Sequence, residues 1–241
     1  MCIRDSRFVK PFLHSGVLEA YEETCAAVDI RTPFVGVCGA PGCGRSTIAT
    51  AALAALPGAA VVDLSASDGD VVAAAAVMLR GRREELPRLL VSLEAPEIIF
   101  LLDGPGNAKA AELPDQLLLL LQLAARPAVF LLAGSRETVE KPLADERITV
   151  RQPVITETSP MRPDETAGYL AHRLAEAGLI DDLFEPDAAT FIGTASAGVP
   201  AAINAVARRS LAAAWVAGSR RVGMQEVSSA VTPAGSDIDG P

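Results

Sequence analysis

The stretch Phe34-Val-Gly-Val-Cys-Gly-Ala-Pro-Gly-Cys-Gly-Arg-Ser-Thr47 decides the fold of this chain. Its apolar residues 34–38 predict a β-strand, the glycine-rich residues 39–44 a turn, and the alanine-rich residues from 45 to about 56 a helix. Residues 39–46 match the motif G-x-x-x-x-G-K-[ST] at every defined position except the lysine, where Arg45 stands. Such glycines let backbone N–H groups turn toward a phosphate, and the helix N-terminus adds partial positive charge. The stretch therefore predicts a phosphate-binding loop.

The loop supplies the candidate nucleotide ligands, which are Gly39, Ala40, Pro41, Gly42, Cys43, Gly44, Arg45, Ser46 and Thr47. The Ser46 hydroxyl is a candidate ligand of Mg²⁺. The guanidinium of Arg45 is always charged and can fork onto phosphate oxygens, so binding can persist. It is bulkier and flatter than a lysine ammonium, which acts as a point charge between the β- and γ-phosphates. We interpret Arg45 as a sign of impaired or absent hydrolysis, with a coding bias toward arginine as the alternative.

Two further polar residues follow predicted strands. Asp103 ends the apolar run 98–103 and is typical of a Walker B acid, which orients Mg²⁺ through water. The alternative for Asp103 is a helix-capping role at a strand-to-helix turn. Ser135 follows the strand predicted at 127–133, and it either orients a water near the phosphate or caps a helical turn that begins at Arg136.

Composition limits the classes of function. The 241 residues suit one large or two modest domains, and 50% of them are apolar, which is enough for a core. The net charge of −9 argues against sequence-independent nucleic-acid binding, although a local basic patch is not excluded by it. The cysteines Cys2, Cys25, Cys38 and Cys43 form no C-x-x-C pair, so a zinc site or disulfide framework is not expected. A reducing cytoplasm is the expected compartment. The sequence contains no apolar run of the roughly 18 residues that a membrane span needs.

The order of the predicted elements indicates an α/β domain followed by a helical one. Residues 1–7 resemble a non-native leader, 8–158 an α/β domain, 159–231 a small all-helical subdomain and 232–241 a loose tail. Strands are predicted at 34–38, 59–64, 98–103, 127–133 and 147–151. Helices are predicted between them at 16–28, 45–56, 69–83 with Asp68 as its cap, 86–93 and 114–125. This alternation predicts a parallel sheet with right-handed crossovers. The later helices are predicted at 163–178, 186–196, 200–217 and 223–231, and His14 and His172 are interpreted as ordinary surface or helix residues.

With these elements placed, the chain resembles an AAA-type P-loop ATPase, closest to the general secretion pathway protein A kind and the related transposition helper ATPases. The resemblance spans about residues 8–231, and its more specific part is the later half. The segments that carry it are Leu143-Ala-Asp-Glu-Arg-Ile-Thr-Val-Arg151, Asp164-Glu-Thr-Ala-Gly-Tyr-Leu-Ala-His-Arg-Leu-Ala-Glu-Ala-Gly178, Phe184, Ala195-Ser-Ala-Gly-Val-Pro200 and Ile203-Asn204. The resemblance implies a P-loop NTPase fold with a helical lid, bound ATP and Mg²⁺, metal contacts at Ser46 and Asp103, and catalytic roles for Asp103 and Ser135.

The residues that differ from the family's pattern stand at its catalytic positions. The family has lysine at the position of Arg45, commonly glutamate at that of Gly104, and usually an arginine that reaches the γ-phosphate at that of Ala201. Arg147 matches a family arginine near the subunit edge, without an assigned role. The leading hypothesis is an ATP-binding protein with weak or lost hydrolysis, in which nucleotide acts as a conformational or assembly ligand. The alternatives are an active ATPase that works as a homo-oligomer in secretion or DNA transposition, and an interaction scaffold that binds no nucleotide.

Overall fold

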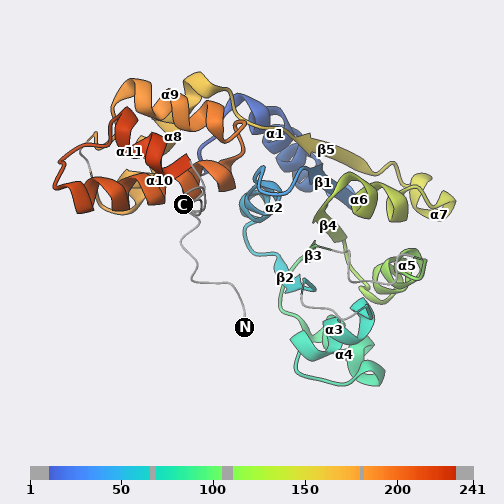
Figure 1. The fold of residues 1–241 in the computed structure, drawn as a ribbon. Coiled ribbons are helices and arrows are strands. Elements are labelled where there is room, and N and C mark those ends of the chain that lie inside the picture. The colour runs from blue at the N-terminus through green and yellow to red at the C-terminus, as the bar shows by residue number, and fades with distance from the viewer. Residues whose placement is uncertain (1–10, 66–68, 105–110, 180–181, 232–241) are drawn as a thin grey trace, which may run out of the picture. The chain divides into compact units, whose positions relative to one another are not determined.

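The computed structural model describes residues 11–65, 69–104, 111–179 and 182–231 (Figure 1). The chain divides into two compact units. The first comprises Leu18–Thr158, and the second joins Phe12–Val17 to the segment that begins at Ser159. The longer segment of the second unit begins at Ser159, and residues 12–17, which the sequence analysis assigned to the α/β domain, group with it. The segments expected at 1–7 and 232–241 lie outside the described residues.

A parallel sheet of five strands forms the centre of the first unit, in the order β2-β3-β4-β1-β5. Its strands are β1 Phe34–Gly39, β2 Ala60–Asp63, β3 Ile98–Asp103, β4 Ala128–Gly134 and β5 Val154–Thr158. Strands β1 and β4 are buried along their whole length, as expected for strands covered on both faces. The predicted parallel sheet is therefore confirmed.

Helices cover the sheet of the first unit. They are α1 Ser15–Asp29, α2 Arg45–Ala52, α3 Val71–Met78, α4 Leu86–Ser92, α5 Leu113–Leu123, α6 Arg136–Leu143 and α7 Glu146–Thr149, with short 3₁₀ turns at Leu53–Ala55 and Arg83–Glu85. On one face of the sheet, Phe130 stacks between Phe34 and Phe100 with ring centroids 5.3 and 4.8 Å apart. Apolar side chains of α3, α4, α5 and α6 pack against this aromatic row. Helix α2 packs on the central strands β1 and β4.

The prediction of a strand at 147–151 was wrong. Residues 146–149 form the short helix α7, and the last strand, β5, begins only at Val154. The Asp145 carboxylate caps this turn by accepting the backbone N–H of Arg147 at 2.9 Å. The cap outweighs the β-type alternation of Ile148 and Val150 with polar residues.

Smaller differences concern caps and burial. The helix predicted at 69–83 is shorter, and its N-cap is Asp70, whose Oδ1 accepts the N–H of Ala73 at 2.9 Å. The expected cap Asp68 lies outside the described residues. The phosphate-loop helix ends at Ala52, followed by a 3₁₀ turn. His14 is not a surface residue, because only 3% of it is exposed.

The second unit is a bundle around its own core, with β-type pairing limited to one bridge among its described residues, between Phe184 and Val222. Its helices are α8 Thr166–Glu176, α9 Pro186–Ala195, α10 Pro200–Ala217 and α11 Met224–Val231, preceded by a 3₁₀ turn at Pro163–Glu165. Their buried residues form one apolar cluster that includes Leu170, Ile192 and Ile203. The four helices predicted after residue 160 are therefore present. The segment 12–17 is held by Glu165, whose carboxylate accepts both the Ser15 N–H at 2.7 Å and the Ser15 hydroxyl at 2.8 Å.

Candidate functional site: the loop between β1 and α2

The loop after β1 has the backbone conformation that a phosphate-binding loop requires. Gly42 and Gly44 have φ of 83° and 91°, values that residues with a Cβ rarely adopt. Gly39 is fixed by space as well, because a Cβ on it would lie 2.3 Å from Oγ1 of Thr158. Three loop positions therefore need glycine, in agreement with the pattern found in the sequence.

Helix α2 begins at the loop without a side-chain cap. Its N-cap is Gly44, so no capping side chain accepts a hydrogen bond from its first N–H groups. The helix dipole leaves partial positive charge at this end, which favours an anion. Ser46 and Thr47 are exposed in the first turn, where their hydroxyls are accessible. These features fit the phosphates of a nucleotide.

The Arg45 side chain interacts with its own loop. Its Nη1 donates a hydrogen bond to the carbonyl oxygen of Gly39 at 3.0 Å. The guanidinium thus spans the turn from the first helical residue back to the end of β1. Cys43 lies fully buried beneath the loop, and burial raises the pKa of its thiol although the nearby charge of Arg45 acts in the opposite direction. A neutral thiol leaves Arg45 without a counter-charge inside the loop.

The other predicted site residues end strands at the same sheet edge. Because the strands are parallel, the carboxyl ends of β1, β4 and β3 lie side by side in that order. Asp103 is level with Ala133 of β4, and Gly134 is level with Cys38 of β1. Two strand spacings, about 10 Å, thus separate the Asp103 backbone from β1. The structure places the loop, Asp103 and Ser135 at one edge of the sheet, and their joint role at a nucleotide stays a prediction.

Asp103 and Ser135 differ in whether a local hydrogen bond already engages the side chain. The Asp103 N–H donates to Oγ of Ser65 at 2.9 Å, and no described residue donates a hydrogen bond to its carboxylate. Ser65 follows β2 at the same edge, and the sequence analysis missed it. Ser135 is the N-cap of α6, with its Oγ accepting the N–H of Thr138 at 3.3 Å. The capping alternative is therefore observed for Ser135, and its catalytic role stays a prediction.

The residues that depart from the catalytic pattern are also placed. Gly104 has a φ of 76° and open space around it, so it supplies a turn directly after Asp103. Ala201 is an exposed residue of α10 in the second unit. Neither side chain can carry a charge or activate a water.

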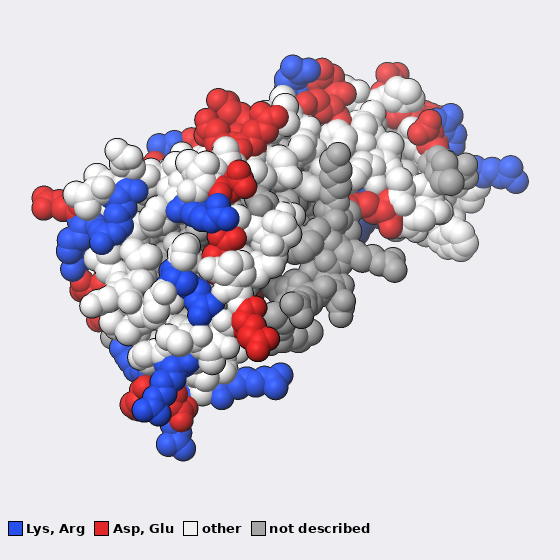
Figure 2. Space-filling model, turned by 180° about the vertical axis from the view of Figure 1, so that it is seen from behind, with Lys and Arg blue, Asp and Glu red and all other residues white. Residues whose placement is uncertain are grey.

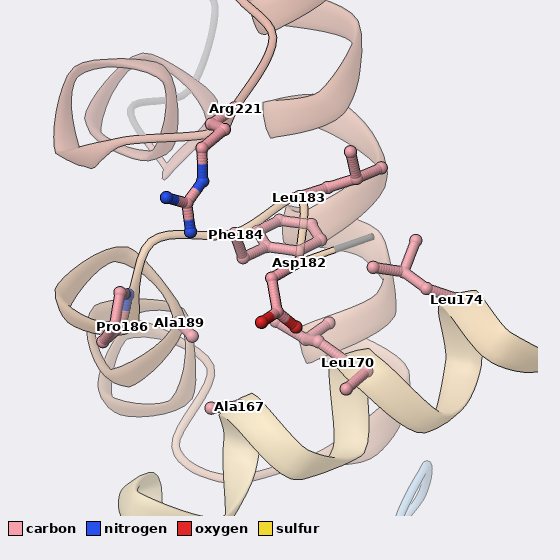
Figure 3. Close-up of a pocket in the computed structure, with 10 residues that line it drawn as sticks. Ala167, Leu170, Leu174, Asp182, Leu183, Phe184, Pro186, Ala189 and Arg221 are labelled. Atoms are coloured by element: carbon pink, nitrogen blue, oxygen red, sulfur yellow. The ribbon is translucent and has the colours of Figure 1, made fainter. Parts of the chain in front are cut away.

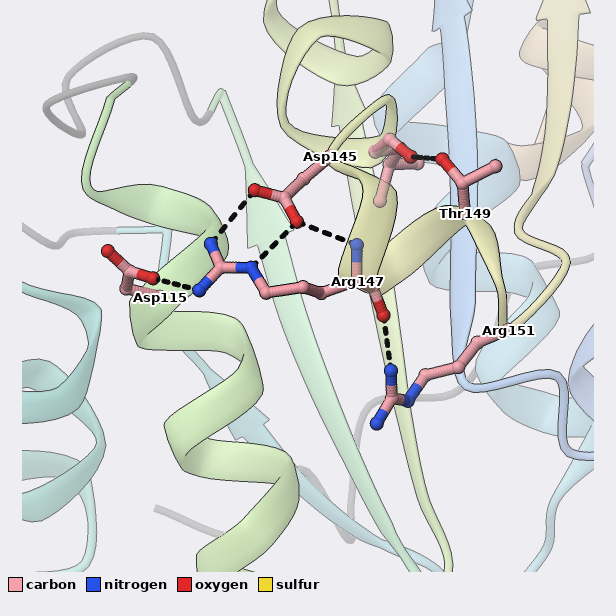
Figure 4. A network of polar contacts seen from close by, with 6 residues as sticks. Asp115, Asp145, Arg147, Thr149 and Arg151 are labelled. Atoms are coloured by element: carbon pink, nitrogen blue, oxygen red, sulfur yellow. Dashed lines mark hydrogen bonds and ion pairs between the residues drawn. The ribbon is translucent and has the colours of Figure 1, made fainter.

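Arg147 lies outside the loop and is engaged by two carboxylates (Figure 4). Its Nη1 donates to Oδ1 of Asp115 at 2.6 Å, and its Nη2 donates to Oδ2 of Asp145 at 2.9 Å. Hydrogen bonds from Arg147, first to Asp145 and then to Asp115, raise the pKa of its guanidinium. The contacts tie α7 to the first turn of α5.

The comparisons with known proteins identify the fold. No family model matches the chain, and no curated protein matches its sequence. RuvB of Thermotoga maritima, a Holliday junction branch migration motor, superimposes with a TM-score of 0.65 and 18% identity over 93% of this chain and 72% of RuvB. ORC1 of Aeropyrum pernix, solved in complex with DNA, gives 0.68 and 18% over 95% of this chain and 67% of ORC1. Drosophila ORC bound to DNA gives 0.67 and 16% over 93% of this chain and 62% of that chain.

These three proteins are AAA+ P-loop ATPases. The chain has the AAA+ P-loop fold. Its α/β unit and its helical unit correspond to the fold class predicted from the sequence, which is confirmed. The narrower resemblance to the general secretion pathway protein A and transposition helper ATPases stays a prediction. No helix among the described residues of this AAA+ fold is long and apolar enough to cross a membrane.

Proposed function

We propose that the chain binds ATP with Mg²⁺ at residues 39–47 and that its hydrolysis is weak or lost, so that nucleotide acts as a conformational or assembly ligand. The observation that carries this proposal is the loop itself. Three constrained glycines and an uncapped helix start supply a phosphate cradle, while Arg45 donates to the Gly39 carbonyl inside that cradle. Binding uses the backbone of the loop, and the loss of hydrolysis follows from its side chains.

The residues present fit a divalent ion at the loop. An Mg²⁺ ion prefers oxygen ligands, and Ser46 and Asp103 offer a hydroxyl and a carboxylate at the same edge of the sheet. The ion would neutralise negative charge on the phosphate oxygens. The residue after Asp103 is a glycine in a left-handed conformation, so the position cannot supply a carboxylate to polarise water.

The surface charges and the free thiols of the described residues bear on partners and compartment. On the face shown in Figure 2, basic and acidic side chains are interspersed, and the described residues there gather into no continuous basic surface. Together with the net charge of −9, this favours nucleotide over DNA as the ligand and a second copy of the chain as the partner in assembly. Cys25, Cys38 and Cys43 are free thiols, which suits the reducing cytoplasm.

The test measures nucleotide binding and phosphate release side by side. Calorimetric titration of ATP and ADP, each with and without Mg²⁺, is expected to show binding that Mg²⁺ strengthens, with no turnover above background. Ser46→Ala should remove most of the benefit of Mg²⁺, about tenfold in affinity, because the hydroxyl ligand is lost. The control is Thr50→Ala, an exposed hydroxyl one turn further along α2.

The possible outcomes separate the alternatives. Lack of binding of either nucleotide with Mg²⁺ would overturn the proposal. The remaining hypothesis would be an interaction scaffold that binds no nucleotide. A rate of ATP hydrolysis per chain that rises with protein concentration would show an oligomeric ATPase instead.

A further inference from the structure

The second unit contains a small pocket between α8, α9 and the loop before α11 (Figure 3). It holds about 150 Å³, which is far below the usual size of a nucleotide or drug-sized site. An apolar space of about this volume is enough for a group the size of benzene. The pocket therefore suits a single apolar side chain or one small molecule.

The floor of the pocket is apolar and buried. Leu170, Phe184 and Ala189 are nearly fully buried, and all three belong to the core cluster of this unit. Ala167, Leu170 and Leu174 stand at helical spacing on α8 and present one face to the pocket (Figure 3). An aliphatic side chain placed there would exchange water for carbon contacts on several sides.

Two side chains of opposite charge, Asp182 and Arg221, line the opening of the pocket. The Asp182 carboxylate and the Arg221 guanidinium both line the pocket and extend into the space that α8 faces (Figure 3). Among the described residues, neither group forms an ion pair or a side-chain hydrogen bond, and they do not pair with each other within 4 Å. A carboxylate and a guanidinium that face one cavity without touching leave room for a ligand that carries both complementary charges.

Backbone hydrogen bonds join the two segments that carry Asp182 and Arg221. Val222 accepts the N–H of Glu185 at 3.0 Å and donates its own N–H to the carbonyl of Leu183 at 2.7 Å. This clip joins the loop of Asp182 to the loop of Arg221, and the Phe184 and Val222 side chains are buried beneath it. The two backbone segments that carry Asp182 and Arg221 are thus held next to each other by the fold.

We propose that this pocket binds a free aliphatic α-amino acid of the leucine class. The α-carboxylate would pair with Arg221, the α-ammonium with Asp182, and the side chain would enter the floor of Leu170 and Phe184. A free amino acid satisfies both charges with one molecule, whereas the interior of a peptide satisfies neither. The site lies wholly within the second unit and does not rest on the proposed nucleotide function.

The test uses the full chain without nucleotide and L-leucine as the probe. Titration calorimetry and ligand-observed NMR are expected to show binding with a dissociation constant of the order of 0.1–1 mM, as suits a ligand of this size. Leucinamide lacks the carboxylate and 4-methylpentanoate lacks the ammonium, so each should bind about tenfold more weakly. N-acetyl-leucinamide, which lacks both charges, should bind more weakly still.

Variants assign each charge to its partner. Arg221→Gln should weaken L-leucine to the level of leucinamide, and Asp182→Asn should weaken it to the level of 4-methylpentanoate. The matched control Arg220→Gln changes the adjacent exposed arginine, which does not line the pocket, and should leave affinity unchanged. Ala171→Leu places a side chain in the mouth and should block binding, while Ala175→Leu, one turn further on the same exposed side of α8, should not.

All of these positions except the floor are exposed, so the variants are expected to fold, which far-UV circular dichroism checks. L-leucine binding that both charge variants weaken would support the assignment. No binding of L-leucine, L-isoleucine, L-valine or L-methionine at about 10 mM, roughly ten to a hundred times the expected dissociation constant, would overturn it. Equal binding of L-leucine and N-acetyl-leucinamide would also overturn it, because it would show an anchor for a peptide side chain instead.

Discussion

Arg45 donates a hydrogen bond from Nη1 to the carbonyl oxygen of Gly39 at 3.0 Å, so the two ends of the phosphate-binding loop are joined by the side chain that replaces its lysine. The bond satisfies the last carbonyl of β1 and orients the guanidinium along the turn. A cation that is engaged with its own backbone has fewer donors left for a transferring phosphate. This arrangement supports the proposal that the loop binds nucleotide while hydrolysis is weak or lost.

Arg45→Lys should therefore restore the point charge that the loop pattern calls for. We expect ATP affinity to rise and slow phosphate release to appear or increase, since lysine reaches the β- and γ-phosphates as a compact ammonium. The measurement is single-turnover hydrolysis of labelled ATP beside equilibrium binding. Arg88→Lys, the same change at an exposed position on α4, is the control. Unchanged turnover in Arg45→Lys would assign the deficit to Gly104 or Ala201 rather than to this side chain.

Gly39→Ala should damage the sheet edge as well as the loop. Its Cβ would approach Oγ1 of Thr158 to 2.3 Å and the Thr158 carbonyl oxygen to 2.6 Å, so β5 must shift. We expect a loss of more than about 2 kcal/mol in the free energy of unfolding, measured by urea titration. The control is Gly58→Ala, where φ is +101° but no atom lies within 4 Å, which should cost only the conformational strain of about 1 kcal/mol. Equal losses in the two variants would show that the contact with Thr158 is unimportant.

Arg147→Ala should loosen the attachment of α7 to α5. The variant loses the ion pairs with Asp115 and Asp145, which are screened by salt because the Arg147 guanidinium is exposed (Figure 4). We expect a small fall in the melting temperature at low ionic strength that shrinks as salt is added. Arg151→Ala is the control, since among the described residues its guanidinium donates to the Arg147 carbonyl and forms no ion pair. A fall in melting temperature that salt does not reduce would mean that packing, and not charge, holds α7.

Much of this fold could be predicted because its strongest signals are local. The run Ile98–Asp103 is apolar, short and bounded, and it forms β3 with the predicted bounds. The loop glycines carry their own conformational requirement, so the β1–loop–α2 unit was readable as well. Residues that follow the strands lie at one edge of the sheet because parallel strands bring their carboxyl ends together.

The remaining features depend on partners that are distant in sequence or on competition between local signals. At residues 147–151 the β-type pattern competed with the Asp145 cap, and the cap prevailed. The hydrogen bond from Arg45 to Gly39 and the contact between Ser65 and Asp103 have no sequence signature. His14 is buried in a segment that groups with residues from Ser159 onward, an arrangement that no local pattern in the sequence reveals.

His14 should make the stability of the second unit depend on pH. Burial lowers the pKa of His14, with the Glu165 carboxylate acting in the opposite direction, and its Nδ1 accepts the N–H of Gly16 at 3.1 Å, which requires a neutral ring nitrogen. Since the folded state holds the proton less tightly than the unfolded chain, whose histidine pKa is about 6.5, the stabilisation is complete above that pH and is lost as pH falls toward the folded pKa. The urea midpoint should therefore drop between about pH 7.5 and 5.5. His14→Gln, whose amide oxygen can accept the same N–H, should flatten that drop, whereas His172→Gln on α8 should retain it; a drop unchanged in His14→Gln would place the titrating group elsewhere.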